Sequence, residues 1–128
     1  MQETNNIVMW FEIYVSDMIR AKKFYQSVFQ REMVDEPNTG PDMQMCMFLS
    51  AGQKATGASG ALVKSQLMKP GSGGTLVYFS CNDCAIESSR VVTNGGKIIK
   101  QKMSIDKYGF IAIAQDSEGN TIGLHSIH

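Results

Sequence analysis

The chain has 128 residues, a length typical of one ordinary domain whose core needs no disulfide staples. Its twelve basic and twelve acidic residues cancel, so no basic field is present to bind nucleic acid or an anionic membrane. The apolar runs are too short to span a bilayer, and three cysteines do not make a disulfide scaffold. The start, "MQETNNIVMW", lacks a signal-peptide pattern, so we expect a reduced, cytoplasmic protein.

The first half of the chain is predicted to form a strand, a helix and three more strands. Met9 to Val15 alternates like a strand and ends at "SD", a helix N-cap signal. The next segment, "MIRAKKFYQSVFQ", has apolar residues at helical spacing. Three short strands are predicted at residues 32–35, 43–49 and 61–64, with turn-rich segments between them.

The second half repeats this order after the linker "KPGSGG". A strand is predicted at 75–81, and "ND" caps a helix at 84–93 that "NGG" ends. Three strands follow at residues 97–102, 110–115 and 121–127. Even the segments "GASGAL" and "GNTIGL", near the two module ends, are alike.

This repetition predicts an α+β fold of two βαβββ modules within a single domain. Module one covers residues 7–66, a linker covers 67–74, and module two covers 75–128. The alternative is a chance similarity between two α+β halves.

The strands have two different faces. In the first strand Trp10, Glu12 and Tyr14 alternate with apolar residues, and Tyr78 occupies a similar place in the first strand of module two. The apolar face suits packing against the helices. A mixed apolar and polar face is typical of a small-molecule cavity, although an ordinary solvent-facing sheet surface looks the same.

These residues resemble the vicinal oxygen chelate superfamily, which includes glyoxalase I, extradiol dioxygenases and the bleomycin resistance proteins. The likeness rests on "EIYVSDMIRAKKFYQSVFQ", on "NGGKI" and on "GFIAIAQDSEGNTIGL", and it is similar to the short branch related to lactoylglutathione lyase. The resemblance implies that the two modules form a curved, incomplete barrel around a cavity. It also implies a homodimer.

In metal-using members of that group, each module supplies one ligand from its first strand and one from its last. By position these sites fall on Trp10, Ala61, Leu76 and Gly123, none of which binds a divalent metal. We therefore expect no metal and no other cofactor, which argues against metal-dependent glyoxalase or dioxygenase activity. The missing side chain of Gly123 would leave room for an organic molecule, or it would mark a bulge.

Two residues are candidates for proton transfer. Glu12 lies among apolar neighbours, and the ordinary pKa of a histidine such as His125 lies near neutrality. A structural ion pair for Glu12 and a structural hydrogen bond for His125 are the alternatives. The candidate ligand-binding residues are Trp10, Tyr14, Tyr78, Gly123 and Phe110.

"CNDC", from Cys81 to Cys84, stands where a strand leads into a helix, as a redox pair would. The surrounding βαβββ pattern is not that of a thioredoxin, so the role of Cys81 and Cys84 is left open.

Three functions fit this pattern. The first is a pocket without a metal for a small organic ligand, in an enzyme of the lyase or isomerase type. The second is a non-catalytic protein that binds an antibiotic-like small molecule. The third is a dimeric interaction module whose cavity is filled by its own side chains. Fold alone does not choose between them.

Overall fold

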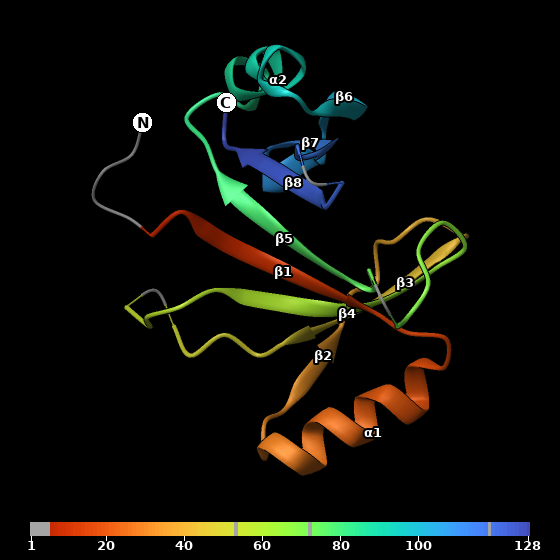
Figure 1. Cartoon of the computed structure of the whole chain (residues 1–128). Helices are drawn as coiled ribbons and strands as arrows, with labels where there is room; N and C mark the ends of the chain where they lie inside the picture. The colour runs from red at the N-terminus through yellow and green to blue at the C-terminus, as the bar shows by residue number, and fades with distance from the viewer. Residues whose placement is uncertain (1–5, 53, 72, 118) are drawn as a thin grey trace. The chain divides into compact units, whose positions relative to one another are not determined.

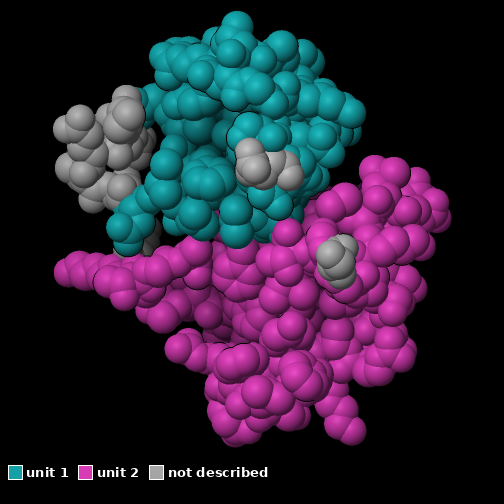
Figure 2. Space-filling model, in the orientation of Figure 1, with its two compact units in different colours: residues 1–9, 76–128 teal, residues 10–75 magenta. Residues whose placement is uncertain are grey.

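The computed structural model describes residues 6–52, 54–71, 73–117 and 119–128 as an α+β protein of two βαβββ modules (Figure 1). Of the described residues, 10–75 form one compact unit, and 76–128 form the other together with 6–9 (Figure 2). The predicted fold class, α+β with two βαβββ modules, is confirmed. Neither α-helix of the described residues is long and apolar enough to cross a bilayer.

Module one contains four strands and one helix on one side of them (Figure 1). The strand order is β2-β3-β4-β1, in which β1 and β4 are parallel and the other pairs are antiparallel. Its elements are β1 (Val8–Tyr14), α1 (Met18–Phe29), β2 (Met33–Asp35), β3 (Met43–Phe48) and β4 (Ser59–Ser65).

Module two repeats this arrangement with the strand order β5-β8-β7-β6. Here β5 and β8 are parallel, and the other pairs are antiparallel. Its elements are β5 (Thr75–Ser80), α2 (Cys84–Val91), β6 (Lys97–Ser104), β7 (Phe110–Gln115) and β8 (Thr121–Ser126), with 3₁₀ turns at Val92–Asn94 and Asp106–Tyr108.

Both predicted helix caps are present. The Asp17 carboxylate accepts a hydrogen bond from the Arg20 amide at 3.0 Å, and the Asp83 carboxylate accepts one from the Ala85 amide at 3.0 Å. The C-cap of α1 is Gln30, which adopts the left-handed conformation (φ 53°). The sequence does not predict this conformation, because a left-handed C-cap is usually a glycine. α2 itself ends at Val91 and runs into the 3₁₀ turn Val92–Asn94, which ends at Gly95 (φ 92°), the first of the two predicted glycines.

Each helix covers one face of its own sheet. In module one, Val15, Met33, Cys46 and Leu62 form a buried cluster that Met18, Ala21 and Tyr25 of α1 pack against, together with Ile13 and Phe48. In module two, Cys81, Cys84, Ala112 and Leu124 form the corresponding cluster, with Phe79 and Phe110 packed on it. The opposite faces of the sheets are therefore left for other contacts, as the strand alternation predicts.

Leu62 is fully buried under α1, so we expect Leu62→Ala to lower the free energy of unfolding by about 2–5 kcal/mol. Leu67→Ala is the matched control, because the Leu67 side chain is 87% exposed, and its effect should stay within about 0.5 kcal/mol. Urea unfolding of both variants measures the difference. Equal losses would contradict a core centred on Leu62.

Candidate functional site

The strand register places the polar residues of β1 on the face that α1 does not cover. Glu12 pairs with Ala61 on β4, and Ala61 pairs with Met47 on β3, so their side chains point to the same side. In the same way, Val63 on β4 pairs with Tyr14 on β1 and with Met45 on β3. We call this surface the Glu12 face; its residues are Trp10, Glu12, Tyr14, Met43, Met45, Met47, Ser59, Ala61, Val63 and Ser65.

The Glu12 carboxylate is held by its two neighbours on the same strand. The Tyr14 hydroxyl donates to Glu12 Oε1 at 2.8 Å, and the Trp10 indole Nε1 donates to Glu12 Oε2 at 3.3 Å. These contacts form because side chains two residues apart on a strand point to the same face. Glu12 is 9% exposed and Tyr14 is 6% exposed, so the carboxylate is fixed in a largely buried position.

The cross-strand neighbours of Glu12 on β4 and β3 are apolar. Ala61 and Val63, beside Glu12 and Tyr14 on β4, are buried, and three methionines of β3 continue the same surface. Methionine thioethers are flexible and polarisable, which suits a wall that adapts to an organic molecule. Three of the predicted site residues, Trp10, Glu12 and Tyr14, are thus brought together on this face.

In module two the equivalent surface is filled differently. Tyr78 on β5 pairs with Gly123 on β8, and a Cβ added at Gly123 would collide with the Tyr78 ring. The prediction that the missing side chain of Gly123 leaves room for an organic molecule is therefore wrong. The ring of Tyr78 occupies that space, which is why a glycine stands in the middle of this strand.

His125 lies on the same face as Gly123, partly buried. Its Nε2 donates a hydrogen bond to the carbonyl oxygen of Tyr108 at 2.6 Å, because a carbonyl can only accept. In the neutral imidazole this assigns the proton to Nε2 and leaves the lone pair on Nδ1. A proton accepted by His125 would therefore go to Nδ1.

Phe110 does not belong with the other predicted wall residues. It pairs with Ser126, on the face of Leu124 and Ala112, and packs on the buried cluster beneath α2. The ammonium of Lys102 lies 4.6 Å from the centre of its ring on this side. Phe110 thus packs, partly buried, on the buried cluster of module two, and its role in ligand binding stays a prediction.

The four positions at which the resemblance places metal ligands do not fit that role. Trp10 gives its indole hydrogen to Glu12, Ala61 and Leu76 are buried hydrocarbons, and Gly123 lies against the Tyr78 ring. None offers an imidazole, carboxylate or thiolate. In the described part of the chain, no group of three or more His, Cys, Asp or Glu residues is arranged to hold a metal ion.

The cysteines of "CNDC" lie inside the core of module two. Burial, with a contribution from the charge of Glu87, raises the pKa of the Cys81 thiol to about 11, and Cys84 is fully buried. A redox cysteine needs the opposite shift, because the thiolate is the reactive form. Burial likewise raises the pKa of Cys46 to about 11.

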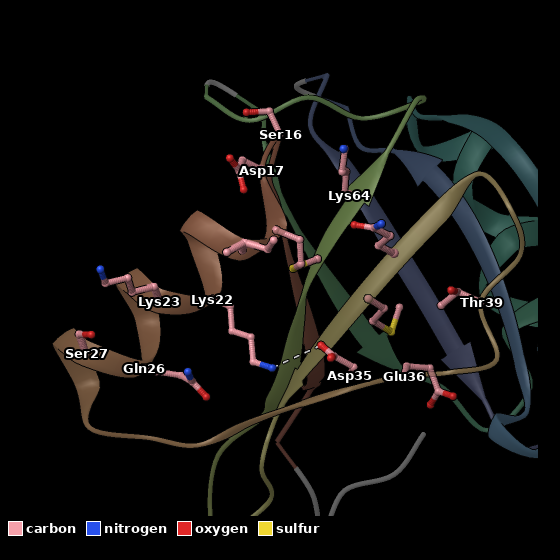
Figure 3. Close-up of a pocket in the computed structure, with 14 residues that line it drawn as sticks. Ser16, Asp17, Lys22, Lys23, Gln26, Ser27, Asp35, Glu36, Thr39 and Lys64 are labelled. Carbon is pink, nitrogen blue, oxygen red and sulfur yellow. Dashed lines mark ion pairs between the residues drawn. The ribbon is translucent and has the colours of Figure 1, made fainter.

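A groove of about 910 Å³ lies beside α1, and sequence reasoning did not single it out. Figure 3 shows Lys22 of α1 reaching across it to Asp35 of β2, with 3.5 Å between ammonium and carboxylate. Its other polar lining residues are Ser16, Asp17, Lys23, Gln26, Ser27, Glu36, Thr39, Gln44 and Lys64. The groove contains none of the predicted site residues, and its mixed charges and openness make it a weaker candidate than the Glu12 face.

Comparisons with known proteins agree on one fold. A family model described as the Glyoxalase/Bleomycin resistance protein/Dioxygenase superfamily matches residues 7–124. A search of the curated proteins finds no match.

Solved structures resemble the chain over nearly its whole length. Methylmalonyl-CoA epimerase from Mycobacterium tuberculosis is 15% identical, with a TM-score of 0.68 over 100% of this chain and 93% of its own. An uncharacterised protein from Methanosarcina mazei is 14% identical, with a TM-score of 0.60 over 94% and 93%. A Streptomyces coelicolor methylmalonyl-CoA epimerase in complex with 2-nitronate-propionyl-CoA is 14% identical, with a TM-score of 0.64 over 95% and 97%. At these identities the likeness concerns the fold.

Because the Tyr78 ring fills the space above Gly123, we expect Gly123→Ala to lower the free energy of unfolding by about 1–3 kcal/mol. Gly40→Ala is the matched control, since nothing lies within 4 Å of a Cβ added there, and its effect should be below about 1 kcal/mol. Urea unfolding measures both.

A double-mutant cycle identifies the cause of that loss. In a Tyr78→Ala background the cost of Gly123→Ala should fall, because the ring that collides with the new methyl group is gone. An unchanged cost in that background would contradict the packing of Tyr78 on Gly123.

Proposed function

Because the chain belongs to the Glyoxalase/Bleomycin resistance protein/Dioxygenase superfamily, we propose that it is an isomerase-type enzyme that moves a proton on a small organic molecule. The proton acceptor in this proposal is Glu12, on the face defined above. The observation that carries the proposal is the fixed, largely buried Glu12 carboxylate among apolar side chains.

The position of this carboxylate suits general base catalysis. A carboxylate removed from bulk water and held by two donors is oriented before the substrate arrives. The proton would leave a carbon next to a carbonyl group, reside on Glu12, and return to the same carbon, so no other reactant is consumed.

The structural neighbours support this reaction class. Two of them are methylmalonyl-CoA epimerases, and epimerisation next to a carbonyl is a proton removal followed by its return. No metal-dependent step is assigned to this chain, because its side chains at the four metal positions offer no ligands.

In module two, His125 is proposed separately as a proton-transfer group that acts through Nδ1, because Nε2 is bonded to the Tyr108 carbonyl. The residues of the Glu12 face would supply the walls of the ligand site. A homodimer without a metal or other cofactor, as the resemblance and the ligand positions imply, is part of the same proposal.

A non-catalytic binding protein is the second candidate. Met43, Met45 and Met47 favour it, because three adaptable thioethers on one strand provide contact area and no chemistry. It differs from the enzyme in one outcome: a ligand would bind to the Glu12 face without exchanging a proton.

The test is proton exchange with solvent. The protein is incubated in D₂O with methylmalonyl-CoA, pyruvate and aminoacetone, and deuterium incorporation is followed by ¹H NMR. We expect incorporation into at least one probe, and Glu12→Gln should lower its rate by about 100-fold or more, because it removes the base while keeping the shape.

Glu32→Gln is the control, because it removes an exposed carboxylate from the same unit. It should leave the rate unchanged, while His125→Ala should lower it. Incorporation no faster than without protein, or a wild-type rate in Glu12→Gln, would contradict the proposal. An unchanged rate in His125→Ala would remove that residue from it.

A further inference from the structure

Three methionines of β3 form a row to which the proposed reaction gives no chemical role. Met43, Met45 and Met47 alternate along the strand with Gln44 and Cys46, so their side chains point to one face of the sheet. We call these three residues the β3 methionines. Met43 is 36% exposed, and the other two are partly buried, so none of the three is enclosed in the core. The strand thus presents three identical sulfur groups side by side.

The neighbours of this row leave the thioethers as its distinctive chemical groups. On β4, Met47 pairs with Ala61 and Met45 pairs with Val63, both of which are buried hydrocarbons. β2 pairs with β3 only as far as Cys46, and Met45, beyond that point, also borders the groove beside α1. Cys46 itself is fully buried on the opposite face of the strand. A metal ion that reaches Met45 from solvent therefore meets thioethers and not a thiol.

Thioethers select one class of metal ion. The soft sulfur of methionine suits Cu(I), whereas zinc prefers thiolate, imidazole or carboxylate, and magnesium and calcium prefer oxygen ligands. A thioether is also neutral, so a site built from thioethers alone does not compensate the charge of a divalent ion. The β3 methionines therefore favour a soft monovalent ion.

The spacing of the row makes Met45 the central ligand. Residues two apart on a strand have Cα atoms about 7 Å from each other. Two methionine side chains, each with three rotatable bonds, can close around one ion over that separation. Met43 and Met47 are about twice as far apart, so each pair of neighbours in the row includes Met45.

From this row we infer that the β3 methionines form a binding site for Cu(I), in which Met45 is the central ligand and Met43 or Met47 is the second. The inference goes beyond the proposed function, because the ion takes no part in the proton transfer and is not a cofactor of it. The site is also distinct from the divalent metal site that the resemblance implies, since none of the four positions considered there is a methionine.

The test follows the methionine methyl groups themselves. The full chain is labelled with ¹³C at the methionine ε-carbon and titrated with silver nitrate in chloride-free buffer. Ag(I) is the probe because it shares the charge and softness of Cu(I) and is stable in air. Each ε-methyl signal is assigned by a Met→Leu substitution, and it moves when its own sulfur binds the ion.

We expect the signals of Met45 and of at least one neighbour in the row to move, with saturation at one ion per chain. The signal of Met103 should stay in place. Met103 is the matched reference, because it is 36% exposed, as Met43 is, and lies on β6 of module two.

Substitutions locate the site within the row. Met45→Leu keeps the side-chain volume and removes the sulfur, so it should weaken Ag(I) binding by at least about tenfold. Met43→Leu and Met47→Leu should each weaken binding less, because one pair of neighbours remains. Met103→Leu should leave the affinity unchanged. Urea unfolding checks that each variant is folded.

Four results would overturn the inference. They are ε-methyl shifts no larger in the row than at Met103, an unchanged affinity in Met45→Leu, Ag(I) binding that moves no ε-methyl signal and so belongs to the thiols, and a titration with Cu(I) under argon that leaves the signals of the row in place. The measurement does not involve deuterium exchange, so failure of the copper site and failure of the proposed reaction are separate outcomes.

Discussion

The parallel pairing between the first and last strand of each module is the constraint on which the rest of the structure depends. In module one it sets Glu12 against Ala61, and in module two it sets Tyr78 against Gly123. Because side chains alternate along a strand, this register decides at once which residues face the helix and which face away. A shift by one residue would bury Glu12 under α1 and expose Leu62 of the core.

The two modules use the same positions for different purposes. Both place a small residue on the last strand opposite a larger one on the first, yet the larger residue is a carboxylate in module one and an aromatic ring in module two. The ring of Tyr78 closes the space above Gly123, whereas the larger residue beside Ala61 is Glu12. The two modules thus differ at equivalent positions, with an aromatic ring packed on Gly123 in one and the Glu12 carboxyl group beside Ala61 in the other.

Much of this arrangement could be predicted from the sequence, because it depends on local rules. The order of elements follows from periodicity, and the starts of both helices follow from the capping residues Asp17 and Asp83. The family resemblance follows from the order and spacing of these motifs. The face on which Phe110 lies could also have been predicted. The turn around Asn120 fixes the hairpin register, which pairs Phe110 with Ser126 and places it on the same face as Leu124.

Other features depend on side-chain positions that no periodicity encodes. The hydrogen bonds of Tyr14 and Trp10 to Glu12, the Tyr78 ring above Gly123, and the bond from His125 to the Tyr108 carbonyl all require rotamers and loop geometry. No glycine marks the left-handed end of α1 at Gln30, so the sequence does not predict this conformation. The sequence therefore predicts the fold more completely than it predicts the contacts within the site.

The most direct test of the central claim is the NMR resonance of the Trp10 indole N–H, which is the only such signal in the chain. If the indole donates to the Glu12 carboxylate, this resonance should move upfield in Glu12→Leu and its hydrogen should exchange faster with water. A resonance unchanged in position and exchange rate would mean that the carboxylate is not held on this face, and the account of the site would fail.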